Sequence, residues 1–170
     1  QKIAPRRIRV IPVFQRLALT FAMTVLFLFS GTSLVRASSA ALPGENLYTV
    51  KRTWEDLRIF FTFDDNQREE LEHEFESERL HEVNELIAEG RHETIQFAGI
   101  YMDVNGQIFI SGVPVVISDT TLLPPEGVSN GLPVVVTGHT DANGFVVIDS
   151  IELLPAGTKV PEGAPVEVEN

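Results

Sequence analysis

The chain has 170 residues, 44% of them hydrophobic, and no cysteine. This length suits one ordinary domain or two small ones, and the lack of cysteine excludes disulfides, thiolate metal sites and cysteine nucleophiles. The first 36 residues carry six basic and no acidic side chains, whereas residues 37–170 carry 24 acidic and seven basic ones, a net charge of −17. Such an acidic body repels phosphates, so we expect no binding to nucleic acid.

An uncharged apolar run, residues 17–35, lies between Arg16 and Arg36. As a helix, this run of 19 residues would measure about 28 Å, close to the roughly 30 Å hydrocarbon core of a bilayer. We therefore expect a basic cytoplasmic tail at 1–16, followed by a transmembrane helix at 17–36 that contacts the lipid bilayer and other membrane proteins.

The competing interpretation of this run is a removable signal peptide. Residues 35–37 and 38–40 both have the small-residue spacing that signal peptidase accepts. In either case the basic tail favours a cytoplasmic N-terminus, with residues 37–170 outside the cytoplasmic membrane.

Residues 37–48 are predicted to be a membrane-exit linker. We expect Pro43 and Gly44 to turn the chain, and the leucines and tyrosine around them to cap the apolar end of the helices that follow. Lys51 and Arg52 are expected to meet either anionic headgroups or an acidic helix. The predicted joint and its packing residues are Leu42, Pro43, Gly44, Leu47, Tyr48, Lys51, Arg52 and Trp54.

Two helices are predicted next. Apolar residues recur at spacings of four, three and four along residues 50–61, which indicates an amphipathic helix. After a break that ends at Asp64 or Asp65, a second apolar face indicates another helix, with Gly90 as its left-handed stop. We expect an acidic helical hairpin over 49–92. The residues expected to pack between its helices are Trp54, Phe61, Phe75 and Leu80.

The second helix carries three Glu-x-x-His pairs, a pattern that binds metal pairs in four-helix bundles. Those centres draw their pairs from separate helices, whereas all three pairs here lie along one glutamate-rich segment. We therefore assign them to a solvated acidic face and expect no metal and no cofactor. The pairs are Glu70 with His73, Glu78 with His81, and Glu89 with His92.

Beyond this helix, residues 94–154 contain five short runs of β-branched and aromatic residues. Asn-Gly turns at 105–106 and 143–144 indicate tight hairpins. We expect a small five-stranded antiparallel OB-like β-barrel over 93–155, with a small sandwich as the second choice. Residues 156–170 form a Pro/Glu-rich tail that is expected to be disordered unless a partner orders it. The predicted fold class is α+β.

The stretch A-L-P-G-E-N-L-Y-T-V-K-R, residues 41–52, and the acidic helices after it resemble a bacterial extracytoplasmic domain of unknown function. Its members often read A-L-P-G-D-x-L-Y-x-V-K-R, and it is found behind the membrane span of some anti-sigma factors and of other envelope proteins. The strands over residues 132–154 are similar to an uncharacterised bacterial OB-type domain. Neither resemblance implies catalytic residues.

No phosphate loop, nucleophile elbow or zinc-protease pattern is present in the sequence, so we expect no enzymatic activity. The leading expectation is a non-enzymatic, single-pass accessory or interaction protein whose outer domain docks on a partner, as a subunit of a larger bacterial membrane complex. The first alternative is the extracytoplasmic sensor part of a transmembrane anti-sigma-type regulator. The second is a surface sugar- or ion-binding module.

Overall fold

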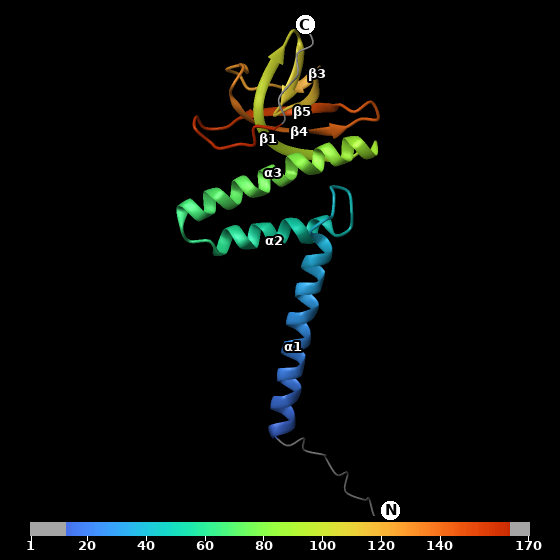
Figure 1. Cartoon of the computed structure of the whole chain (residues 1–170), viewed down its shortest axis with the longest axis vertical. Coiled ribbons are helices and arrows are strands. Elements are labelled where there is room, and N and C mark those ends of the chain that lie inside the picture. Colours follow the sequence, from blue (N-terminus) through green and yellow to red (C-terminus); the bar gives the residue numbers. More distant parts are fainter. Residues whose placement is uncertain (1–12, 164–170) are drawn as a thin grey trace, which may run out of the picture. The chain divides into compact units, whose positions relative to one another are not determined.

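The computed structural model describes residues 13–163, with the side chains of residues 17–25 and 35–163. The chain divides into two compact units, Gln1–Ala40 and Ala41–Asn170, and Figure 1 labels most of their elements. The α+β class is confirmed, because the second unit combines helices with a closed β-barrel.

The first unit contains helix α1 (Val13–Ser38). Within the described part of the chain, no helix combines the length and the apolar character that a bilayer span requires, so the predicted transmembrane helix at 17–36 is wrong. Residues 1–12 of the predicted basic tail, 1–16, lie outside the described residues.

The second unit begins with a helical hairpin, α2 (Tyr48–Phe61) and α3 (Asp65–Glu89). Local signals set the ends of α3. The Asp64 carboxylate accepts a hydrogen bond from the backbone N–H of Gln67 at 2.9 Å, which satisfies a free amide of the first turn. Gly90 ends the helix with a φ of 65°, a left-handed conformation that suits glycine. α3 lies between α2 and the barrel (Figure 1).

Five strands form the barrel in the order β1-β2-β3-β5-β4, and pairing of β1 with β4 closes it. The predicted five-stranded barrel is confirmed, and the structure shows that it is closed; β3 and β5 are parallel, so the prediction of a wholly antiparallel barrel is wrong. Strand directions can alternate around a closed ring only if the number of strands is even, and five strands therefore require a parallel pair. The strands are β1 (Thr94–Val104), β2 (Gln107–Ile110), β3 (Val113–Leu122), β4 (Pro133–Thr140) and β5 (Val146–Leu153).

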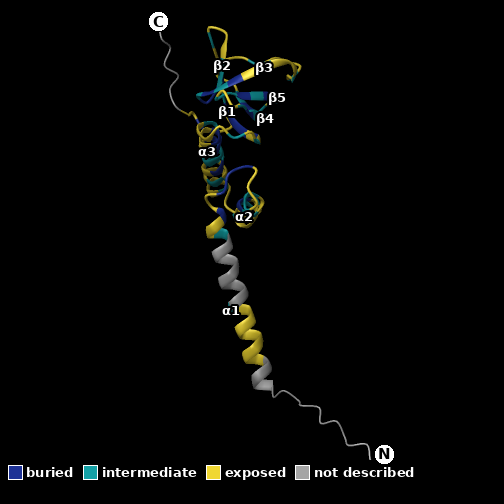
Figure 2. Ribbon diagram, turned by 90° about the vertical axis from the view of Figure 1, so that its right-hand side faces the viewer, coloured by how far each residue is buried: buried dark blue, intermediate teal, exposed yellow. Residues whose placement is uncertain are grey.

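One continuous hydrophobic core joins α3 to the barrel. Alternate residues of β4 are buried, as expected for a strand with one face toward a core. The buried face of α3 belongs to the same cluster, and Figure 2 shows it in dark blue. The α3 members are Leu80, Val83 and Leu86, and the barrel members include Ile95, Phe97, Val134 and Val136.

The segment after β5 is partly held on this unit. Val160 and Pro161 are buried, and the Ser111 hydroxyl donates a hydrogen bond to the Pro161 carbonyl. The Lys159 ammonium lies 3.2 Å from the Glu69 carboxylate on α3. These contacts hold residues 159–161 on the unit; disorder of the tail as a whole stays a prediction, and residues 164–170 lie outside the described residues.

Candidate interaction surface

The predicted joint lies at the start of the second unit, where it packs on the core. Leu42 is buried and belongs to the same cluster as α3 and the barrel strands. Ala41 and Pro43 are also buried, whereas Leu47 and Tyr48 are half-buried. The backbone N–H of Leu42 donates to the Glu45 carboxylate at 3.1 Å, which closes the turn before α2.

Arg91 ties this joint to the end of α3. Its guanidinium donates to the Pro43 carbonyl at 3.0 Å and to the carboxylates of Glu45 at 3.1 Å and Glu93 at 3.3 Å. Gly44 has a φ of +87°, and a Cβ there would lie 2.0 Å from the Glu93 carboxylate. Glycine at this position is therefore favoured by the left-handed backbone, whereas the Glu93 carboxylate is the end of a flexible side chain that can move away. The sequence gives no periodic signal for Arg91 and Glu93, because both lie in the loop between α3 and β1.

Lys51 is buried between the two helices, with 7% of its side chain exposed. Its ammonium lies 2.6 Å from the Glu78 carboxylate and 2.6 Å from that of Glu82. The Tyr48 hydroxyl donates to the other Glu82 oxygen at 3.1 Å. Of the two partners considered for Lys51, the structure shows the acidic second helix.

A second group of charges continues this contact. The Glu55 carboxylate accepts from Arg52 at 2.8 Å and from Arg79 at 3.3 Å, and Arg79 also pairs with Glu76. Glu76 in turn accepts from the backbone N–H of Ala98 on β1 at 3.2 Å. Burial raises the pKa of both Glu55 and Glu76, because it outweighs the cations and hydrogen bonds that favour the charged form.

We call this contact the charged seam. It consists of Lys51, Arg52 and Glu55 on α2, and Glu76, Glu78, Arg79 and Glu82 on α3.

Five large apolar side chains of α2 and of the turn after it are exposed to solvent. Phe60, Phe61 and Phe63 are 70%, 60% and 82% exposed, and Trp54 and Leu57 are also exposed. The prediction that Trp54 and Phe61 pack between the helices is therefore wrong. Charged residues occupy that position instead, while Phe75 and Leu80 of α3 are buried. We call the exposed set, Trp54, Leu57, Phe60, Phe61 and Phe63, the aromatic stripe.

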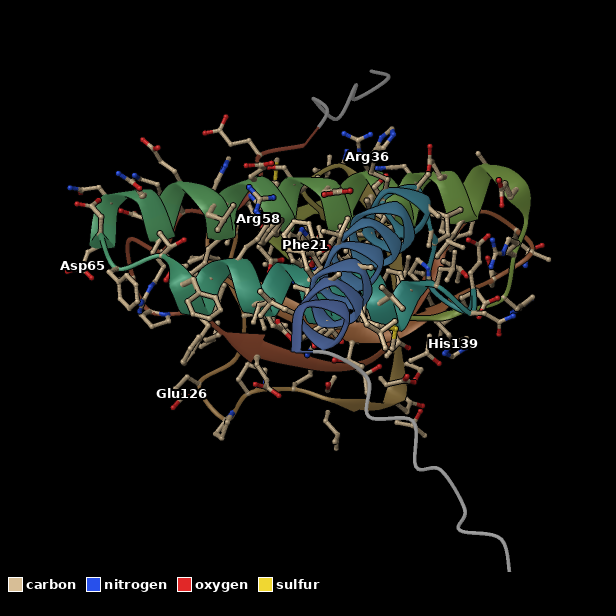
Figure 3. The ribbon with its side chains drawn as sticks, turned by 90° about the horizontal axis from the view of Figure 1, so that it is seen from below. Phe21, Arg36, Arg58, Asp65, Glu126 and His139 are labelled. Atoms are coloured by element: carbon tan, nitrogen blue, oxygen red, sulfur yellow. The ribbon has the colours of Figure 1, made fainter. Side chains whose placement is uncertain are left out.

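Two arginines flank the aromatic stripe. Arg58 places its guanidinium 5.1 Å from the centre of the Phe75 ring, a cation–π contact, and Figure 3 shows it beside α3. Arg68 donates to the Thr62 carbonyl at 2.9 Å and 3.3 Å. Neither arginine forms an ion pair with a described residue. The other described cations of this unit do, namely Lys51, Arg52, Arg79, Arg91 and Lys159.

A shallow depression lies on each side of the stripe. One is lined by Asp56, Ile59, Phe60, Phe63 and Arg68, and the other by Arg58, Phe61, Thr62, Gln67 and Leu71. Trp54 and Phe61 were predicted to pack between the helices, and no pattern in the sequence predicted that the phenylalanines or the two arginines lie on the surface. The four-three-four spacing does show that Trp54, Leu57 and Phe61 share one face of α2. That face was predicted to point into the hairpin, whereas it is exposed.

The Glu-x-x-His pairs do not converge. Glu78 binds Lys51, and His81 lies 3.3 Å from Glu85, one turn further along α3. Among the described residues, no group of three or more histidine, aspartate or glutamate side chains is placed to hold a metal ion.

These elements define an α+β protein in which a helical hairpin packs on a closed barrel. A Domain of unknown function (DUF5667) is found at residues 40–98, which include the joint, α2, α3 and the first part of β1. This confirms the expected domain of unknown function in that segment, and its extracytoplasmic setting stays a prediction. No curated protein and no solved structure matches the chain.

Proposed function

We propose that the second unit is a non-enzymatic protein-interaction module that docks on a partner through the aromatic stripe. The observation that carries the proposal is the orientation of α2, which buries Lys51 and Glu55 and exposes Trp54, Leu57 and Phe61. A helix that packs only on its own protein turns its apolar stripe inward. Exposed apolar patches rimmed by polar residues are typical of protein–protein contact sites.

The size of the stripe supports a docking role. At their observed exposures, the three phenylalanines leave roughly 400 Å² of side-chain surface in water. Covering it is worth about 10 kcal/mol before the costs of association are subtracted. Trp54 and Leu57 extend this surface along α2, and aromatic side chains are enriched among the residues that dominate binding energy.

The barrel supports this surface through α3. Its closed five-stranded connectivity favours the OB-like assignment, and such barrels commonly bind nucleic acids or sugars. Residues 94–154 contain no lysine or arginine, so a role in nucleic-acid binding has no electrostatic support. The resemblance of residues 41–52 to extracytoplasmic domains supports a place for this module in the bacterial envelope, as part of a larger assembly.

Site-specific photo-crosslinking tests the proposal. A photoreactive phenylalanine analogue replaces Phe60 in the full chain, which is produced in its own host and irradiated. The control carries the analogue at Leu122, an exposed apolar residue of the barrel. We expect a discrete protein adduct from position 60 that is absent at position 122 and is lost when Leu57→Asp is added. Identical adducts at both positions, or none at position 60, would remove the proposal.

A further inference from the structure

We propose that the partner presents an amphipathic α-helix to the aromatic stripe, with apolar side chains at three-four spacing and carboxylates along the flank that meets Arg58. The inference rests on the proposed function, because it names the kind of partner that the same surface accepts.

The spacing of the stripe indicates a helical partner. Trp54, Leu57 and Phe61 of the stripe follow the partly buried Val50 at four, three and four residues, and α2 extends over all of them. This spacing gives the seam of a coiled coil, in which each apolar side chain inserts between four side chains of a facing helix. An extended strand presents side chains with a period of two and does not match it. The 14 residues of α2 offer about 21 Å for the contact.

The charge beside the stripe indicates the sign of the partner's flank. Arg58 is exposed, and its guanidinium donates no hydrogen bond to a described residue. The depression that it lines with Phe61 and Leu71 contains no carboxylate. The paired lysines and arginines of this unit are held by glutamates, whereas the described partner of the Arg58 guanidinium is the Phe75 ring, which leaves its N–H groups available to bind a carboxylate. Asp56 lies near Arg68 in the opposite depression, so the preference for an anion belongs to the Arg58 side.

Two other occupants fit the charges less well. A second copy paired about a two-fold axis at Leu57 would bring two Arg58 side chains together, and like charges in contact destabilise an interface. An anionic lipid surface would face the whole acidic body, which carries a net charge of −17 over residues 37–170. A single partner helix contacts only the stripe. Acidic groups of this protein that lie more than about 8 Å from the partner helix are screened at physiological salt and repel it little.

Two synthetic helical peptides serve as probes. Both carry leucine at the apolar positions and lack tryptophan; one has glutamate at the flanking positions and the other has lysine there. Trp54 is the single tryptophan of the chain and lies in the stripe, so its fluorescence reports binding directly. The full 170-residue chain is titrated with each peptide at physiological salt.

We expect the glutamate-flanked peptide to shift Trp54 emission to shorter wavelength and to bind at least about tenfold more tightly than the lysine-flanked one, a difference of about 1.4 kcal/mol. The variant Arg58→Gln should abolish this preference and Arg58→Glu should reverse it. The control Lys159→Glu changes the net charge by the same amount as Arg58→Glu but keeps Arg58, and it should leave the preference unchanged.

Three results would overturn the inference. The first is equal or tighter binding of the lysine-flanked peptide. The second is a Trp54 shift with lipid vesicles but with neither peptide, which would indicate a membrane surface. The third is a shift that grows with protein concentration in the absence of peptide, which would indicate a second copy. If position 60 gives a protein adduct and one of these three results is also obtained, the proposed docking surface stands. Only the proposal that its partner is an acidic helix is then overturned.

Discussion

Lys51 shows how the neighbours of one residue set its effect on the fold. Burying an ammonium group costs several kcal/mol unless carboxylates and hydrogen bonds compensate it. Here two glutamates lie at 2.6 Å, and one of them, Glu82, is itself only 5% exposed. Tyr48 adds a hydrogen bond to the same carboxylate. Removing Lys51 would leave the buried Glu82 carboxylate without its cation. Loss of one partner of a buried ion pair lowers the free energy of unfolding strongly, because the other charge stays buried and uncompensated.

The same residues predict a loss of stability at alkaline pH. Burial lowers the pKa of Lys51, but its hydrogen bonds to Glu78 and Glu82 outweigh this and raise it above 10.5. Burial and the charge of Glu82 raise the pKa of Tyr48 above 10.0. Both groups hold their protons more tightly in the folded chain. The protonated forms of Lys51 and Tyr48 therefore stabilise the fold fully below about pH 10. This contribution to the free energy of unfolding is lost as the pH rises through their pKa values in the folded chain.

Urea unfolding between pH 8 and pH 11.5 measures this effect. We expect the free energy of unfolding of the unmodified chain to fall above pH 10. The double variant Lys51→Met, Tyr48→Phe should be less stable at pH 8 by about 3 kcal/mol and should lose less on going to pH 11.5. Lys159→Met, which removes an exposed ion pair, is the control and should follow the unmodified chain. An unchanged alkaline slope in the double variant would contradict the assignment.

At the scale of elements, α2 is a helix whose charged side faces its own protein. Its sequence predicts a helix and an apolar stripe, and both are present. Periodicity fixes which residues share a face, but the neighbours in space decide whether that face points inward. Cations on α2 and glutamates on α3 provide the competing inner contact, which was predicted only for Lys51 and Arg52.

Features that depend on neighbouring residues were predicted more reliably than features that depend on residues far apart in the sequence. Asp64 and Gly90 act on the backbone next to them, so their roles as helix start and stop could be predicted from the sequence alone. The parallel pairing of β3 and β5 depends on ring closure among all five strands. The contact of Pro161 with Ser111 joins residues 50 positions apart, and no pattern near either residue indicates it.

The orientation of α2 predicts opposite outcomes for two large-to-small substitutions. Leu86 is completely buried, so Leu86→Ala should lower the free energy of unfolding by about 2–5 kcal/mol. Phe61→Ser, on the exposed stripe, should change it by less than about 1 kcal/mol. Chemical denaturation of the two variants at neutral pH measures the difference. A loss at Phe61 as large as that at Leu86 would show that the stripe packs inside the hairpin.

At the scale of the whole molecule, the boundary of the matched domain and the boundary of the folded unit differ. The domain of unknown function covers residues 40–98, so it ends inside β1, which continues to Val104. The buried face of α3 shares one core with strands from the remainder of the barrel. Polar contacts also cross this boundary, since the Thr140 hydroxyl accepts from the backbone N–H of Glu93 at 3.0 Å.

We therefore predict that the hairpin and the barrel unfold together. A fragment of residues 41–163 should lose its far-ultraviolet helical signal and its Trp54 fluorescence in one coincident urea transition. A fragment of residues 41–98 would expose Leu80, Val83 and Leu86. Its helices would keep the charged seam and the contacts of Arg58, Arg68 and Arg91 but would lose the shared core, so we expect low helicity and no cooperative transition. Adding the complementary fragment 99–163 should restore helicity if the barrel supplies the missing core. A cooperative transition of fragment 41–98 alone would instead show that the charged seam suffices to fold the hairpin, and would make the matched domain an independent folding unit.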